Sequence, residues 1–273
     1  MLKDVQNSKD KRGIAIDKVG IKNLHYPISV LDKTKKFQHT VADINMYVDL
    51  PHYFKGTHMS RFLEVLNEHR GEISIINFPG ILRKIKKVLN AGSASVEMEF
   101  PYFIEKTAPV SGKKSLMEYI CYYNGTIRDT AKEKLKVSDL KSDTFNYDES
   151  VIIIGVKVPI NTLCPCSKEI SKYGAHNQRG VVSVSLEFSK LVWFEDIIGD
   201  VESCASSPIY SLLKRDDERY LTEHAYENPM FVEDIARCVA GILKKNKNIK
   251  WFRVEAENFE SIHNHNAYAM IEG

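Results

Sequence analysis

The clearest indication of how this chain folds comes from residues 150–188, which read SVIIIGVKVPINTLCPCSKEISKYGAHNQRGVVSVSLEF. Residues 150–159 form a long apolar run typical of a buried strand. Residues 181–188 alternate apolar and polar side chains, which predicts a second strand with one buried face. Residues 163–180, between them, hold two thiols, a histidine and an acid. Because Cys and His are the softest metal ligands among the side chains, we interpret this segment as a functional site.

The whole chain is long enough for one large domain or two small ones. It has 273 residues, of which 43% are hydrophobic, and its 38 Lys and Arg residues nearly balance 36 Asp and Glu residues. The net charge of +2 gives no general attraction to nucleic acid or to an anionic membrane. The N-terminus lacks the pattern of a signal peptide, and no apolar run approaches the roughly 20 residues that span a bilayer. We therefore expect a cytoplasmic protein.

The cysteines do not form the pattern of a disulfide-stabilised protein. There are five, an odd number spread unevenly over a long chain: Cys121, Cys164, Cys166, Cys204 and Cys238. In a reducing compartment such thiols are expected to be free or bound to metal.

Both halves of the chain follow the order strand, strand, helix, helix, strand, strand. In the first half we predict strands at residues 19–31, 37–50, 95–104 and 116–128, and helices at 59–66 and 79–90. In the second half we predict strands at residues 150–159, 181–188, 251–258 and 267–271, and helices at 194–201, at 209–214 and from Asn228 onward.

This order predicts an α+β fold with two modules of antiparallel sheet, each covered by helices on one face. Residues 1–17 are a polar arm, 18–131 the first module, 132–147 a charged connector, and 148–273 the second module, which carries the site. Sheet edges and open faces would remain, and oligomerisation is one way to cover them.

The candidate ligands have both functional and structural interpretations. If the chain is extended at Cys164 and Cys166, both thiols point the same way, and Pro165 favours an extended Cys164. They could instead be two buried small side chains. His176 follows Cys164 by twelve positions, so one loop could bring both to an ion, or His176 could be a surface residue in a turn.

Four further residues could carry chemistry. Glu218 lies in the charged run 216–219, which reads as a solvated helix end. Glu233 is either an acid favoured by a helix N-terminus or a carboxylate held against a ligand. His263 and His265 face one side of an extended segment, or are exposed polar residues of a turn.

These residues lie in segments that closely resemble the signature of the type IB GTP cyclohydrolase I family. The signature segments are Leu163-Cys-Pro-Cys-Ser-Lys-Glu-Ile-Ser and Gly174-Ala-His-Asn-Gln-Arg. The resemblance extends from about residue 18 to the end of the chain. Its other matching segments are 20–24, 26–27, 58–61, 207–215, 217–218, 222–229, 231–234 and 260–265.

The resemblance implies a fold, an assembly and a reaction. The fold is the tunnelling fold, with two ββααββ modules per chain, and chains of the family assemble into a barrel-like homotetramer. The reaction converts GTP and water to 7,8-dihydroneopterin triphosphate and formate, the first step toward tetrahydrofolate. The enzyme is thus a hydrolase of cyclic amidine C–N bonds, with no nucleic-acid or membrane partner.

The resemblance also implies residue roles. Cys164, His176 and Glu218 would bind one divalent ion per subunit, zinc, manganese or iron, with Cys166 as the alternative thiolate. Such an ion lowers the pKa of a bound water for attack at guanine C8, and Cys164 counts as catalytic for this reason. Glu233 would accept hydrogen bonds from guanine N1–H and the 2-amino group. The proton-transfer candidates are His263 and His265, and the triphosphate candidates are Lys168, Arg179, Arg61 and Arg215.

Three other functions compete with this interpretation. Two are related enzymes on the same fold: an archaeal-type GTP cyclohydrolase that makes a cyclic phosphate, and an NADPH-dependent nitrile reductase of queuosine biosynthesis. The third is a structural zinc knuckle in a binding protein, which would have four protein ligands and no turnover.

Overall fold

The computed structural model describes residue 6 and residues 8–69, 73–128 and 150–273. The predicted connector, 132–147, lies outside the described residues. The chain divides into two compact units: residues 1–100 with 123–152, and residues 101–122 with 153–273. Residues 101–122 therefore group with the second half of the chain, although they lie within the predicted first module. Among the described residues, no helix is both long and apolar enough to cross a membrane.

The first unit contains the predicted strands and helices. Its strands are β1 (Ile16–Asp32) and β2 (Lys36–Leu50), followed by parts of β3 (Ser93–Thr107) and β4 (Lys114–Arg128). The four strands are neighbours in that order, and the β1–β2 and β2–β3 pairs are antiparallel. Every second residue along most of β2 is buried, as the sequence alternation predicts.

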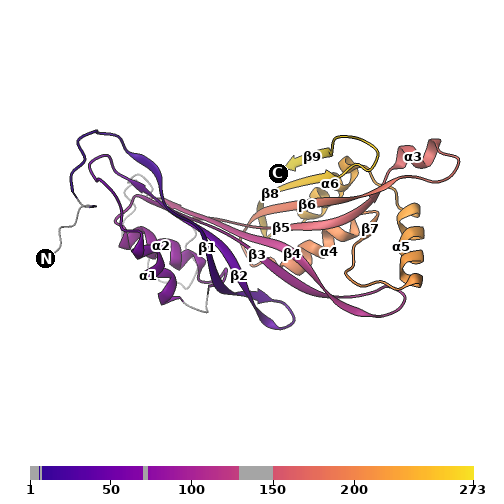
Figure 1. The fold of residues 1–273 in the computed structure, drawn as a ribbon, viewed down its shortest axis with the longest axis horizontal. Coiled ribbons are helices and arrows are strands. Elements are labelled where there is room, and N and C mark those ends of the chain that lie inside the picture. The colour runs from indigo at the N-terminus through magenta and orange to yellow at the C-terminus, as the bar shows by residue number, and fades with distance from the viewer. Residues whose placement is uncertain (1–5, 7, 70–72, 129–149) are drawn as a thin grey trace. The chain divides into compact units, whose positions relative to one another are not determined.

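Two helices cover the buried face of the first unit (Figure 1). They are α1 (Ser60–Glu68) and α2 (Phe78–Val88), which contact each other. Phe78 of α2 packs against Tyr123 of β4, with ring centroids 5.9 Å apart. A Cβ atom at Gly125 would lie 2.5 Å from the Phe78 ring and 2.7 Å from Leu82, so only glycine lets the helix approach the strand this closely.

The described part of the N-terminal arm forms backbone hydrogen bonds with the segment that follows β2. Asp10 N donates to Tyr53 O at 3.1 Å, and Lys55 N donates to Ser8 O at 3.1 Å. These bonds hold the arm against the segment that follows β2.

The second unit is built on a longer antiparallel arrangement. Parts of β3, β4 and β5 (Ser150–Leu163) are followed by β6 (Asn177–Phe188), β8 (Ile249–Asn258) and β9 (Ala267–Glu272). The β5–β6, β6–β8 and β8–β9 pairs are antiparallel, and the short β7 (Ser207–Pro208) pairs with β5. The predicted strands at residues 150–159, 181–188, 251–258 and 267–271 are confirmed.

Two helices of the second unit, α4 and α6, each bury a stripe of apolar side chains. α4 (Phe194–Ser203) buries four apolar side chains, and α6 (Val232–Leu243) buries six and contacts β8 and β9. The predicted apolar face of α6 is confirmed: Val232, Ile235, Ala236, Val239, Ala240 and Leu243. If each gives about 1 kcal/mol or more on burial, this stripe is a main source of the stability of the unit.

Two predicted helix positions are wrong. Residues 209–214 form no helix; they are irregular and lead into α5 (Arg215–Glu227), which the apolar pattern did not predict. Asn228 does not begin a helix either, because it is the C-terminal cap of α5, and α6 begins after Phe231.

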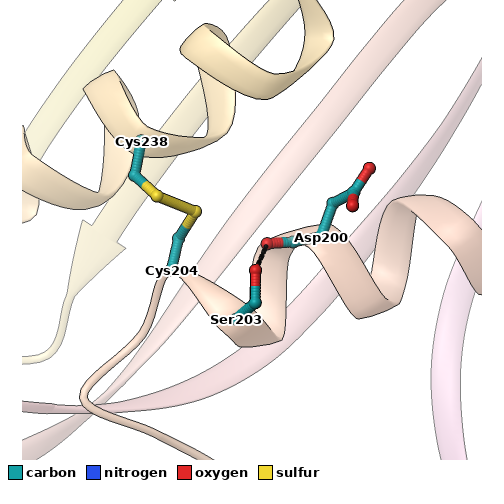
Figure 2. Close-up of a disulfide and its surroundings, with 4 residues drawn as sticks. All are labelled: Asp200, Ser203, Cys204 and Cys238. Carbon is teal, nitrogen blue, oxygen red and sulfur yellow. Dashed lines mark hydrogen bonds between the residues drawn. A yellow bond between two sulfur atoms is a disulfide. The ribbon is translucent and has the colours of Figure 1, made fainter.

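The expectation that all five thiols are free or bound to metal is also wrong in this structure. Cys204, at the end of α4, forms a disulfide with Cys238 of α6 (Figure 2). The two residues are 34 positions apart, and only the packing of the helices brings them together. Cys121, Cys164 and Cys166 are free.

Candidate active site

Cys164 is held at the junction of β5 and the short helix α3 (Pro165–Ile170). It is the N-cap of α3, with extended backbone, and its Sγ accepts a hydrogen bond from Ser167 N at 3.4 Å. Pro165 occupies the first turn, where its missing N–H costs nothing. The thiol is therefore fixed at the start of the helix.

Cys166 does not lie on the same side of an extended segment as Cys164. That prediction is wrong because Cys166 is inside α3, where residues two apart do not share a face. Cys166 is exposed, whereas Cys164 is half-buried. The structure thus places the two thiols in different environments, a difference that their spacing in the sequence could not predict.

His176 is brought to Cys164 by the backbone. Cys164 N donates to His176 O at 3.1 Å. Ser167 joins the two as well, since its Oγ donates to Cys164 O at 3.1 Å and accepts from His176 N at 3.2 Å. The imidazole Nδ1 lies 2.9 Å from Oε1 of Gln178 and 3.4 Å from Oγ of Ser261.

Glu218 faces an open cavity of about 550 Å³ in the second unit. Polar side chains from β5, β6 and the β7 segment line the same cavity: Asn161, Asn177, Arg179, Ser207 and Tyr210. Asn177 follows His176 directly, so the cavity begins next to the predicted imidazole ligand.

Asp217, the neighbour of Glu218, anchors the start of α5. It is buried, contrary to the expectation of a solvated charge run. Its carboxylate accepts from Val110 N and Ser111 N at 2.8 Å, from Ser111 Oγ at 2.6 Å and from Lys214 N at 2.8 Å. Burial alone would raise the pKa of Asp217, but these hydrogen bonds outweigh it and hold the pKa well below its usual range. Glu218 is thereby presented from a fixed helix end.

A buried ion pair supports the Tyr210 side of the cavity. Lys106 Nζ donates to Glu202 Oε1 at 2.7 Å and to Ile209 O at 2.8 Å, and lies 4.3 Å from the Tyr210 ring centroid. Tyr119 donates to the same Glu202 oxygen at 2.7 Å. Burial lowers the pKa of Lys106, which Glu202 partly opposes, and burial together with Glu202 raises the pKa of Tyr119 well above its usual range.

Glu233 lies in the first turn of α6 and is exposed. The segment before α6 is tied to the site, because Met230 N donates to Leu163 O at 3.1 Å, one residue before Cys164. Phe231 N donates to the side chain of Asp234 at 3.2 Å, which closes the helix start.

His263 and His265 lie in the exposed loop between β8 and β9. Both are exposed and lie in a bend, not in an extended segment, as the alternative interpretation of exposed polar residues in a turn predicted. Their rings stack with centroids 5.1 Å apart. Phe259 N donates to Arg179 O at 2.9 Å, and Ser261 contacts the His176 ring, so this loop begins beside the site.

The cations predicted to meet the triphosphate differ in their surroundings. Arg179 lines the cavity, and Arg215 begins α5. Lys168 donates to Tyr226 O and lies 4.4 Å from the Tyr226 ring centroid. Arg61 belongs to the first unit, where its guanidinium donates to Val88 O at 3.1 Å.

The donor set suits a divalent ion, but the three predicted ligands do not form a closed group. Among the residues that the structure describes, no three His, Cys, Asp or Glu side chains lie close enough to hold a metal. Cys164 and His176 nevertheless fit the ligand role: their backbones are joined, and the His176 ring is oriented through Nδ1. Thiolate, imidazole and carboxylate together accept zinc, manganese or iron.

Sequence patterns did not predict the residues that hold the candidate ligands and the cavity wall in place. They are Thr162, Gln178, Ser111, Lys106 and Asp217, whose roles depend on contacts between distant segments. Gln178 and Asp217 do lie inside the matching motifs, which is the one signal that could have indicated them.

Comparison with known structures identifies the fold class. The urate oxidase of Bacillus sp. TB-90 matches with a TM-score of 0.52 at 8% identity, over 94% of this chain and 99% of that one. The antiparallel strands with few helices and this likeness define a tunnelling-fold protein of the α+β class, as predicted.

The family follows from the sequence comparisons. A model of the type I GTP cyclohydrolase folE2 family matches residues 2–269. GTP cyclohydrolase FolE2 of Syntrophus aciditrophicus is 58% identical over 269 residues, which cover 98% of each chain. That of Geotalea uraniireducens is 55% identical over 271 residues, which cover 99% of this chain and 93% of the relative. The chain belongs to the FolE2 family of type I GTP cyclohydrolases.

Proposed function

We propose that this protein is a type IB GTP cyclohydrolase, which hydrolyses GTP at guanine C8 and gives formate and 7,8-dihydroneopterin triphosphate for tetrahydrofolate synthesis. The observation that carries the proposal is the full-length similarity to FolE2 relatives, in a chain whose Cys164 and His176 are joined beside a polar cavity.

Glu233 selects the base in this proposal. Its carboxylate can accept from guanine N1–H and from the 2-amino group, a pair of donors that adenine does not present. Glu233 lies in the first turn of α6, where its exposed carboxylate is accessible to a ligand. The hydrogen bond from Met230 N to Leu163 O keeps this helix start next to the Cys164 segment.

Cys164, His176 and Glu218 would hold one divalent ion, with Cys166 as the alternative thiolate. When bound, the ion supplies the Lewis acidity that activates water for attack at C8. The half-buried position of Cys164, against the exposed Cys166, supports Cys164 as the thiolate. Asp217 keeps the helix end that carries Glu218 in place.

His263 and His265 would move the protons that ring opening and loss of formate require. An imidazole can donate a proton from one ring nitrogen and accept one at the other, and both side chains are exposed on the loop that contacts His176. Arg179 is the cation that faces the cavity, and it would counter the charge of the triphosphate.

The protein would act in the cytoplasm as a homotetramer. Apolar side chains exposed on the outermost strand, Tyr268 and Met270 of β9, support association through this edge. Sedimentation at working concentration tests the assembly, and a fully active monomer would contradict it.

The decisive experiment incubates metal-loaded protein with GTP and measures formate and pterin fluorescence. We expect the two products in equal amounts, loss of both on chelation, and recovery when metal is restored. ATP in place of GTP is the matched control and should give neither. Metal-loaded protein that releases no formate would overturn the proposal. A cyclic phosphate in the product would identify the archaeal-type reaction, and NADPH oxidation with a nitrile substrate would identify the reductase.

A further inference from the structure

A buried chain of polar groups runs from the sheet interior to the His176 ring. Thr162 of β5 and Gln178 of β6 are direct cross-strand partners. Their exposed fractions are 0% and 7%, so neither side chain exchanges its hydrogen bonds freely with water. Gln178 Nε2 donates to Thr162 Oγ1 at 2.9 Å, and Gln178 Oε1 lies 2.9 Å from His176 Nδ1.

The arrangement of these hydrogen bonds favours one position for the imidazole proton. The Thr162 hydroxyl donates to Gln178 O at 3.5 Å, which leaves Oγ1 to accept from the Gln178 amide nitrogen. The other end of that amide is then its carbonyl oxygen, which can only accept. With the amide in this orientation, the 2.9 Å contact with Gln178 Oε1 requires a proton on His176 Nδ1, which leaves the lone pair of the neutral ring on Nε2.

We propose that Gln178, held by Thr162, is a positioning residue that fixes His176 in the Nδ1–H tautomer and so leaves Nε2 as the donor atom for a divalent ion. This inference rests on the proposed metal-binding role of His176. Metal-ligating histidines generally donate their second ring N–H to an acceptor in the protein, and here the acceptor is an uncharged amide built into the sheet. The bond between Cys164 N and His176 O holds the backbone of the same residue, so ring and main chain are both fixed before metal binds.

Other contacts of the ring do not account for the same constraint. Ser261 Oγ lies 3.4 Å from His176 Nδ1, and a hydroxyl can either donate or accept, so it favours neither tautomer. Ser261 is also exposed, whereas Gln178 is not. Ser261→Ala is therefore the matched control, because it removes a contact of the same nitrogen without removing the buried acceptor.

The test uses Gln178→Met and Thr162→Val, which nearly preserve side-chain shape, and Gln178→Glu, which keeps an acceptor towards Nδ1. Zn²⁺ affinity is measured by chelator competition. We expect the Zn²⁺ dissociation constant to rise about 10- to 100-fold in Gln178→Met and less in Thr162→Val. Ser261→Ala should match the wild type, and Gln178→Glu should retain wild-type affinity.

The ring itself gives a second readout in the metal-free, full-length protein. Nitrogen-15 spectra of labelled histidine, with the His176 signals assigned by their loss in His176→Asn, distinguish the two neutral tautomers. The wild type and Gln178→Glu should show the Nδ1–H form, and Gln178→Met a mixture. An Nε2–H ring in the wild type, or unchanged Zn²⁺ affinity in Gln178→Met, would overturn the inference.

Thermal unfolding separates these effects from misfolding, since a purely structural role would lower the midpoint and leave the tautomer unchanged. Both readouts are independent of turnover, so a protein that releases no formate would refute the proposed reaction and still test the tautomer.

Discussion

The ion pair between Lys106 and Glu202 offers a quantitative test of how the second unit supports its cavity. The Lys106 and Glu202 side chains are only 10% and 16% exposed, and Lys106 also donates to Ile209 O. Lys106→Met keeps most of the apolar stem, but it leaves the Glu202 carboxylate with the neutral hydroxyl of Tyr119 in place of a counter-ion. Removing one partner of a buried pair costs about 3–5 kcal/mol, and the residual exposure favours the lower end, about 3 kcal/mol.

Glu202→Gln and the double variant complete a cycle with Lys106→Met. Glu202→Gln keeps an oxygen that can accept from Tyr119, but it leaves the Lys106 charge without its counter-ion. The double variant has no uncompensated charge, so its loss should be at least about 2 kcal/mol smaller than the sum of the single losses. Urea unfolding followed by circular dichroism at fixed protein concentration measures each value.

Lys114→Met is the control for this cycle. Lys114 of β4 contacts Glu105, the neighbour of Lys106 on β3, at 2.9 Å, but both side chains are more than half exposed. Loss of this exposed ion pair in Lys114→Met should leave the unfolding midpoint unchanged. A Lys106→Met protein that loses less than about 1 kcal/mol, or a double variant that loses the full sum, would refute the assignment of a coupled buried pair.

Three further outcomes are expected. Glu233→Gln should lower kcat/KM for GTP by about 10²-fold or more with bound metal unchanged, because a donor would face a donor of the base; loss of metal instead would reassign Glu233 as a ligand. Cys164→Ala should lose most of its metal and activity, and Cys166→Ala less, as measured by metal content and formate release; the reverse order would make Cys166 the ligand. Asp217 has a pKa below its ordinary 3.8, so it stabilises the folded state above that value and this contribution is lost as pH falls below it. Asp217→Asn should therefore have a lower unfolding midpoint than the wild type at pH 7. As the pH falls from about 5 to 3, the midpoint of the variant should decrease less than that of the wild type. An equal decrease in both proteins would contradict this.

The parts of the fold that were predictable from sequence are those with a periodic apolar pattern. Strand alternation located β2 and β6, and the stripe of α6 was recognised residue by residue. α5 was not predictable in this way, because only Asp217 and Ala225 of its 13 residues are buried and no apolar stripe marks it. Its start is set instead by Asp217, whose partners Val110 and Ser111 are more than 100 positions away.

The candidate site shows the same division between local and distant signals. The motif around Cys164 and His176 indicated the reactive groups, and the backbone pairing of those two residues followed from the loop. Spacing alone could not distinguish Cys164 from Cys166, since the choice depends on a helix beginning at Pro165. The Cys204–Cys238 disulfide also required knowledge of which helices pack together.

The second unit takes residues 101–122 from the first half of the chain, and this limits how the protein can be divided by genetic engineering. A fragment that starts at residue 148 would contain Asp217 and Glu202 but lack Ser111 and Lys106, their hydrogen-bond donors from the other stretch. Such a fragment would carry every proposed metal ligand and still miss the supports of the cavity. Cleavage of the intact protein within residues 132–147 is a different operation, because both stretches of each unit are then already assembled, and the two pieces should remain together and co-purify.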